Sequence, residues 1–161
     1  MDAIDRQLLD LLRRSARLSY AELARKVGLS APAVHERVGK LENAGVIRGY
    51  HADVDPESVD LGVTALVRVV HDTSVDIDDL VAAIRELPEI ESCYFLAGEE
   101  SLLLKLRVAT IAELERLVVQ LGRTAGVANT RTTIALSTKW EGRPRPLQPA
   151  PAKASRGGPI T

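Results

Sequence analysis

The most constraining feature of the sequence is a short link between two helix signals, the tripeptide Gly28-Leu29-Ser30. Ser19 and Glu22 form a capping-box pattern that predicts the start of a short helix, which Gly28 ends because glycine accepts the left-handed conformation. Ser30 can cap the next helix, and Pro32 falls in its first turn, where the missing N–H costs little. Two helices joined by so tight a turn predict a helix-turn-helix arrangement.

Three further patterns complete this amino-terminal region. Apolar residues at helical spacing behind Asp2 predict a preceding helix over about residues 3–15. The helix after Ser30 carries an apolar stripe and stops at Gly45. Residues 46–52 are rich in β-branched and aromatic side chains, which predicts a short strand. We therefore expect residues 1–52 to form one helical domain.

The outward face of the third helix suggests how this domain binds its partner. Because Val34, Val38 and Leu41 should face the core, the small residues Ala31 and Ala33 permit a close approach to base edges in a DNA major groove. We expect base contacts from His35 and Arg37, and phosphate contacts from Ser30 and Lys40. A three-helix bundle with an ordinary solvated face remains the alternative.

The charge distribution favours the DNA-binding interpretation. Residues 1–52 carry a net charge of +3, residues 53–138 a net charge of -8 and residues 139–161 a net charge of +4, within a total of -1. A basic first segment beside an acidic middle segment is expected where only the first segment approaches a polyanion.

Three sequence runs resemble a known family: residues 22–30 (ELARKVGLS), residues 37–42 (RVGKLE) and residues 45–50 (GVIRGY). They are similar to the Lrp/AsnC family of bacterial leucine- and asparagine-responsive "feast/famine" regulators. The resemblance implies a sequence-specific transcription regulator with a DNA-binding headpiece, a hinge and an αβ domain that senses an amino acid or a related metabolite. It also implies homodimers that assemble into larger rings such as octamers.

The rest of the chain predicts a second domain. Residues 53–63 are expected to be a hinge, and residues 64–138 an αβ domain with a helix that starts after Thr73 or Ser74 and a last strand over 129–137. The order strand, helix, strand, strand, helix, strand predicts an α+β fold of the ferredoxin-like, split βαβ type, with both helices on one side of an antiparallel sheet.

The other side of this sheet suggests self-association. Leu66 and Val70 on one strand and Leu103 on another point toward it, so we expect a face too apolar for water. A second copy of the sheet would cover this face and produce a homodimer. The headpiece or the carboxy-terminal tail could cover it instead.

The resemblance places an effector site at the turn that follows the second predicted strand. Gly98 lets a backbone approach a ligand closely, and Glu99 or Glu100 could meet an ammonium group. Tyr94 and Thr133 are expected to line the pocket. Ser101 stands where the family commonly has an aspartate. An architectural DNA-binding protein without effector control therefore remains an alternative. A second alternative is that Glu99 and Glu100 are merely solvated and bind no ligand.

Other classes find little support in the sequence. His35, His51 and His71 lack metal-ligand spacing, the single cysteine excludes an internal disulfide, and no catalytic constellation or cofactor motif supports the alternative of a small ferredoxin-like enzyme. The absence of long apolar runs and of a signal peptide favours a cytoplasmic protein that does not bind membranes. Residues 139–161, rich in proline, are expected to be a disordered basic tail.

Overall fold

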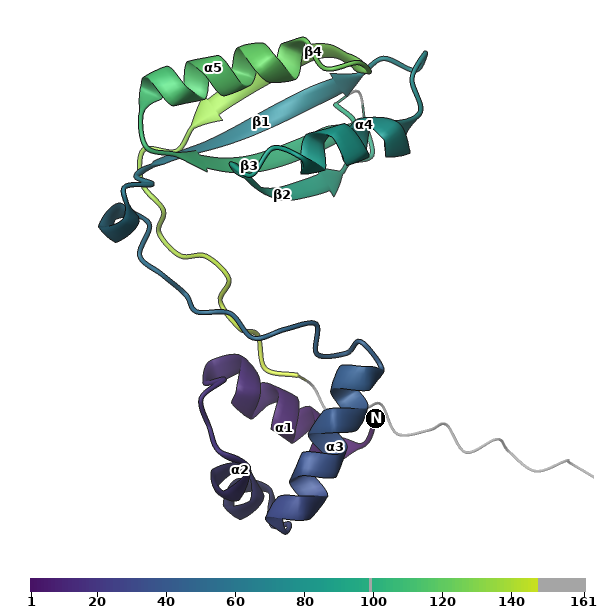
Figure 1. Ribbon diagram of the computed structural model, residues 1–161, viewed down its shortest axis with the longest axis vertical. Helices are drawn as coiled ribbons and strands as arrows, with labels where there is room; N and C mark the ends of the chain where they lie inside the picture. Colours follow the sequence, from purple (N-terminus) through teal and green to yellow (C-terminus); the bar gives the residue numbers. More distant parts are fainter. Residues whose placement is uncertain (99, 148–161) are drawn as a thin grey trace, which may run out of the picture. The chain divides into compact units, whose positions relative to one another are not determined.

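The computed structural model describes residues 1–98 and 100–147, which fold as two compact units (Figure 1). One unit combines Met1–Ala52 with the segment that begins at Trp140, and the other spans Asp53–Lys139. No helix in these described residues is long and apolar enough to cross a lipid bilayer.

The first unit is built from three helices: α1 (Ala3–Arg14), α2 (Tyr20–Val27) and α3 (Ala31–Asn43). Its core consists of side chains at helical spacing, namely Leu8, Leu12, Leu23, Ala24, Val34 and Val38. The structure confirms the predicted link between α2 and α3. Ser19 and Glu22 form a reciprocal capping box, and Gly28 ends α2 in the left-handed conformation at φ 73°.

The prediction of a strand over residues 46–52 is wrong. The backbone N–H groups of Val46 and Ile47 both donate to the carbonyl of Leu41, at 2.9 and 3.1 Å, so this segment closes the end of α3 instead of pairing with another strand. Tyr50 then donates its hydroxyl to Glu42 at 2.7 Å. Burial, together with this carboxylate, raises the pKa of Tyr50 to about 12. β-Branched composition without a partner strand does not produce a strand.

The predicted tail begins with a segment that contacts α1. The guanidinium of Arg13 donates to the carbonyl of Arg145 at 2.7 Å, and the N–H of Leu147 donates to the carboxylate of Asp10 at 2.9 Å. We call residues 140–147 the strap. Residues 148–161, which carry the rest of the expected disordered tail, lie outside the described residues.

The second unit is a four-stranded antiparallel sheet with two helices (Figure 1). Its elements, after a short 3-10 helix at Glu57–Val59, are β1 (Val63–His71), α4 (Ile77–Arg85), β2 (Ile90–Phe95), β3 (Leu102–Val108), α5 (Ile111–Gly122) and β4 (Val127–Ile134). The strands lie in the order β2-β3-β1-β4. This order confirms the predicted split βαβ arrangement and the α+β class.

The core of this unit lies between the sheet and the two helices. Ala65, Val67 and Val69 on β1 are fully buried, as are Leu102, Leu104 and Leu106 on β3. Leu80 and Ile84 from α4 pack on these strands together with Leu114, Leu117 and Leu121 from α5. Both helices therefore cover the same face.

The helix α4 begins later than its sequence signals indicated. Its N-cap is Asp76, whose side chain accepts from the N–H of Asp78 at 2.8 Å. Ser74 lies in a turn before the helix, where its N–H donates to Asp72 at 2.9 Å. Several possible caps within a few residues compete, and the acidic side chain of Asp76 is the one that caps the helix.

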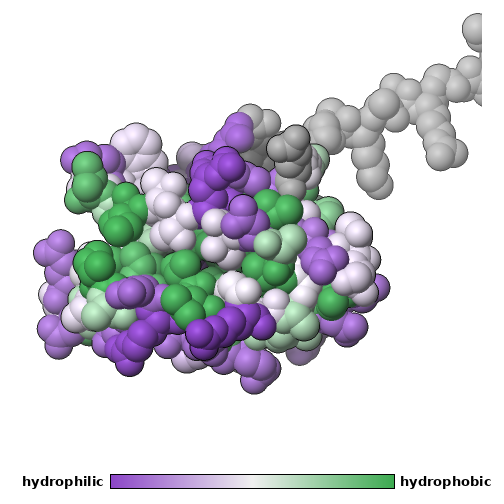
Figure 2. Space-filling view, turned by 90° about the horizontal axis from the view of Figure 1, so that it is seen from above, coloured by the Kyte–Doolittle hydropathy of each residue, from purple (hydrophilic) through white to green (hydrophobic). Residues whose placement is uncertain are grey.

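The uncovered face of the sheet is less apolar than expected. Leu66, Val70 and Leu103 do lie on it, but they alternate with cationic side chains: the Lys105 ammonium contacts the Glu91 carboxylate, and the Arg107 Nε lies 3.6 Å from the same carboxylate. Figure 2, which views the molecule from above Figure 1, shows hydrophobic and hydrophilic residues interspersed on that side. Burial of apolar area alone therefore does not require a second copy of the sheet.

Candidate functional site

The helix α3 is held by its cap and by its buried stripe. Ser30 has an extended backbone and accepts from the N–H of Ala33 at 3.4 Å, while Pro32 occupies the first turn. Val34 and Val38 are almost completely buried in the three-helix core. The opposite side of α3 is therefore presented away from this core, as the sequence predicts.

The residues predicted to contact DNA fall into two groups on α3. Ser30, His35 and Lys40 are exposed, whereas Ala31, Ala33 and Arg37 are partly buried. The ring of His35 packs edge-on against Tyr20 of α2, with the ring centroids 4.9 Å apart. The small side chains thus lie with Ser30 and His35 at the start of α3, whereas Lys40 lies in its last turn.

Lys40 lies in an ion pair along the helix. Its ammonium group is 2.6 Å from the Glu36 carboxylate, four residues earlier, and both side chains are well exposed. The hydrogen bond from Lys40 lowers the pKa of the Glu36 carboxyl. Exposed pairs of this kind are weak, so a phosphate can replace Glu36 as the partner of Lys40.

Arg37 has a different environment from the one the sequence suggested. Its Nη1 donates to the carboxylates of Asp2 and Asp5, each at 2.7 Å, and so joins α3 to the N-terminus of α1. The pKa of Asp2 is lowered first by the backbone N–H of Asp5 and then by Arg37. Sequence reasoning missed this contact because the partners lie more than thirty residues away in the chain.

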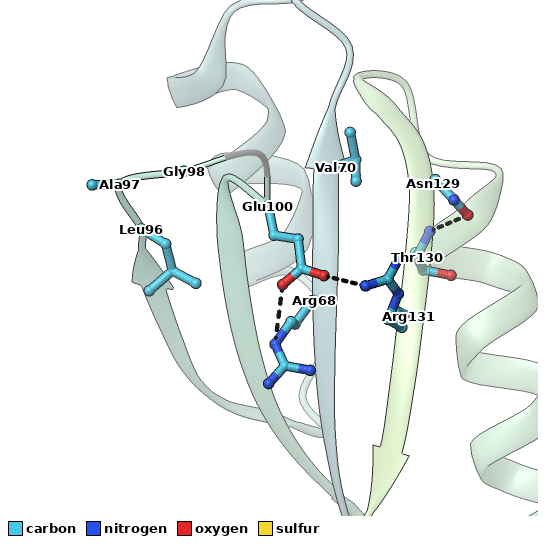
Figure 3. A pocket seen from close by; sticks show the side chains of 9 residues that line it. All are labelled: Arg68, Val70, Leu96, Ala97, Gly98, Glu100, Asn129, Thr130 and Arg131. Atoms are coloured by element: carbon cyan, nitrogen blue, oxygen red, sulfur yellow. Dashed lines mark hydrogen bonds and ion pairs between the residues drawn. The ribbon is translucent and has the colours of Figure 1, made fainter.

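A second site lies at one end of the sheet, beside the turn between β2 and β3. It is a cavity of about 340 Å³, and Figure 3 shows its lining residues. These are Arg68 and Val70 from β1, Leu96, Ala97, Gly98 and Glu100 from the turn, and Asn129, Thr130 and Arg131 from β4.

Glu100 forms the centre of the charge arrangement in this cavity. Its carboxylate forms an ion pair with the Nε of Arg68 at 3.1 Å and accepts a hydrogen bond from the Nη1 of Arg131 at 3.1 Å (Figure 3). Arg68 and Arg131 stand directly opposite each other in the register of β1 and β4. The carboxylate therefore bridges two cations that would otherwise repel.

Only some of the predicted effector residues lie in this cavity. Gly98 and Glu100 line it, while Tyr94 on β2 and Thr133 on β4 lie outside its lining, and Ser101 accepts the N–H of Leu96 through its backbone carbonyl. Glu99 lies outside the described residues.

The two arginines are the residues that sequence reasoning missed. The alternation of side chains along β1 and β4, combined with the strand order of a split βαβ fold, places Arg68 and Arg131 on the uncovered face of the sheet. This signal was present in the sequence, but it required the pairing of β1 with β4.

Metal binding and nucleophilic catalysis find no support in the parts of the chain that the structure describes. There, no group of three or more histidine, cysteine, aspartate or glutamate side chains is placed to hold a metal ion. The Cys93 side chain is exposed, and the partial burial of its thiol raises the pKa above its ordinary value, which does not favour the thiolate.

Comparison with known proteins gives matches over both units. The family model described as "AsnC-type helix-turn-helix domain" matches residues 1–42, and the one described as "Lrp/AsnC ligand binding domain" matches residues 63–144.

Individual proteins match over most of the chain. The HTH-type transcriptional regulator LrpA of Mycobacterium tuberculosis is 41% identical over 89% of this chain and 95% of its own length. The leucine-responsive regulatory protein of Haemophilus influenzae is 39% identical over 84% of each chain. The structure of a feast or famine regulatory protein from M. tuberculosis complexed with L-methionine is 41% identical, with a TM-score of 0.85 over 91% of this chain and 99% of that one.

The contact between Arg37 and α1 leads to a prediction for stability. We expect Arg37→Met to lower the melting temperature of the helical unit, because Asp2 and Asp5 lose the cation that joins them to α3. Asp5→Asn should also lower it, and the double variant should melt no lower than the worse single variant. Thermal unfolding of the full chain, followed by circular dichroism, measures these effects.

Arg25→Met on the exposed surface of α2 is the control. An equal effect of Arg25→Met and Arg37→Met would show that the ion pair does not stabilise the unit.

The contribution of Asp2 to stability also has a definite pH dependence. Because its pKa is lowered on folding, the contribution is present above the ordinary value of 3.8 and is lost as the pH falls through the folded value. The difference between the native chain and Asp2→Asn should therefore disappear in strongly acidic buffer.

Proposed function

Since this chain belongs to the Lrp/AsnC family of transcriptional regulators, we propose that α3 reads DNA through its outward side chains and that the cavity beside Gly98 binds an amino-acid effector. Like its relatives, the protein is a DNA-binding transcription regulator and not an enzyme. The observation that carries the effector proposal is the cavity between the β2–β3 turn and the strands β1 and β4.

For DNA binding, we assign separate tasks to the side chains of α3. His35 contacts base edges, the small Ala31 and Ala33 allow the helix to approach them, and Ser30 and Lys40 contact phosphates. Arg37 reaches a base only after its guanidinium leaves Asp2 and Asp5. Base contact by Arg37 therefore competes with a contact that joins α3 to α1.

For the effector, we propose a small molecule with a carboxylate and an ammonium group. The solved relative that holds L-methionine supports this class of ligand. Gly98 and Glu100 take part from the cavity lining, and Tyr94, Ser101 and Thr133 act from the neighbouring strands and turn. We keep Glu99 in the same proposal on the basis of its sequence position.

We also propose that the chain acts as a homodimer, with higher oligomers such as octamers built from it. The uncovered sheet face supports this proposal through its partly exposed apolar residues, among them Leu66 and Tyr94. A two-fold axis would present two α3 helices to half-sites about 34 Å apart, or a multiple of that spacing. Because its partner is DNA, we place the protein in the cytoplasm.

A pair of variants tests the phosphate contact of Lys40. We expect Lys40→Ala to weaken binding to all duplex sequences and to reduce the salt slope by about 1, because one phosphate contact is lost. Glu36→Gln should have the opposite effect on affinity, since it removes the carboxylate that competes for Lys40. Fluorescence anisotropy with cognate and random duplexes across a salt series measures both. A loss restricted to the cognate sequence would contradict the role of Lys40.

Thermal shift against the twenty amino acids tests the effector site. A ligand at about one hundred times its Kd stabilises the folded state by about 2.7 kcal/mol, which gives a measurable shift. We expect a shift with at least one amino acid, and its loss in Gly98→Trp. Gly98 has a φ of 140°, so Trp also strains the backbone; Val70→Phe fills the cavity without that strain and should abolish the shift as well. No shift with any amino acid would favour the architectural alternative.

Mass measurement by light scattering tests the dimer. We expect particles of two copies or a multiple of two, and Leu66→Glu should reduce the mass to that of one copy because it places a charge in the proposed interface. Val119→Glu, at a similarly exposed apolar residue on α5, is the control and should leave the mass unchanged. A native chain that runs as one copy would overturn this proposal.

A further inference from the structure

We propose that the cavity beside Gly98 selects an effector of net negative charge, namely an amino acid with a second carboxylate. This inference rests on the proposed function, because it takes the cavity to be the effector site. It goes further by naming the class of amino acid, and it is carried by Arg68, Glu100 and Arg131.

The first argument is the charge of the lining. The strands β1 and β4 contribute two guanidinium groups to the lining, those of Arg68 and Arg131, and no carboxylate. Glu100 of the turn supplies one carboxylate, which leaves an excess of one positive charge among these three described groups. A neutral amino acid carries no net charge and leaves this excess in place. An acidic amino acid carries one negative charge and balances it.

The second argument is the position of the two arginines. Arg68 and Arg131 face each other across β1 and β4, an arrangement that is unfavourable for like charges. Glu100 offsets one of the two charges through its contacts with both guanidinium groups, each at 3.1 Å. A carboxylate of the ligand would offset the other positive charge. Both the charges and the volume of the cavity therefore favour an anionic ligand.

The third argument is the supply of hydrogen-bond donors. Glu100 takes one nitrogen from each arginine, the Nε of Arg68 and the Nη1 of Arg131. Among the described residues, the two Nη groups of Arg68 have no hydrogen-bond partner, and the Arg131 side chain is 76% exposed. A guanidinium binds a carboxylate through two parallel N–H groups, so each arginine can receive one carboxylate of the ligand.

Together these groups form a complete set of partners for an acidic amino acid. The two carboxylates of the ligand contact Arg68 and Arg131, and its ammonium group contacts Glu100, whose side chain is 26% exposed. A cavity of about 340 Å³ lies within the usual range for small ligands. A basic amino acid, in contrast, would add a positive charge beside two cations.

The test compares pairs of ligands that have the same shape and differ in charge. L-glutamate and L-glutamine form one pair, and L-aspartate and L-asparagine form the other. By isothermal titration calorimetry on the full chain, we expect the acidic member of at least one pair to bind at least about tenfold more tightly at low salt. The advantage should shrink as the ionic strength rises.

Arg131→Met identifies the source of this preference. We expect it to weaken the acidic ligand more than its amide and so to remove the advantage of the acid, because only the acid has a second carboxylate that loses its partner. The matched control is Arg116→Met on α5, because its side chain is 75% exposed and lies outside the cavity lining. Glu100→Gln should weaken the acid and the amide alike, since both carry the ammonium group. A thermal melt without ligand confirms that each variant is folded.

The outcomes separate this inference from the proposed function. Equal or tighter binding of the amides would overturn the selection of acidic ligands and leave the cavity as an effector site. An acidic preference that survives Arg131→Met, or that Arg116→Met removes equally, would overturn the role of the arginines. Absence of binding by every amino acid would overturn both this inference and the effector site itself.

Discussion

The alternation of side chains along β1 and β3 determines both the core and the cavity of the αβ unit. Val67 and Val69 are fully buried beneath α4 and α5, and the intervening Arg68 therefore points to the other face. A slip of one residue would bring Arg68 under the helices and expose the valines. Burial of each aliphatic side chain contributes about 1.5–3 kcal/mol, whereas burying an unpaired charge costs several kcal/mol. The register that builds the core is thus the register that builds the binding site.

Local signals made most of the fold predictable. The reciprocal cap of Ser19 with Glu22, the left-handed Gly28 and the N-cap Ser30 depend on residues within one helical turn, and each is present in the structure as predicted. Residues 46–52 show the limit of this reasoning. Their composition suits a strand, but a strand also needs a neighbour to pair with, and the backbone of Val46 pairs with the end of α3 instead.

The candidate site was predictable only where it is local. Gly98 and Glu100 belong to one turn, so the sequence could indicate them, and both line the cavity. Arg68 and Arg131 come from strands far apart in the chain and meet only through the β1–β4 register. The pairing of Arg37 with α1 was hidden for the same reason. In this protein, long-range partners decide what the charged residues do.

The strap gives the DNA-binding unit a discontinuous origin. Its three helices are encoded before the αβ unit, while the segment that bonds to Asp10 and Arg13 is encoded after it. During translation, the ribosome therefore synthesises every strand of the sheet before it reaches the strap, whose backbone bonds to Asp10 and Arg13. The headpiece therefore gains its hydrogen bonds to the strap only after the residues of the αβ unit have been synthesised, which sets an order in time for the two units.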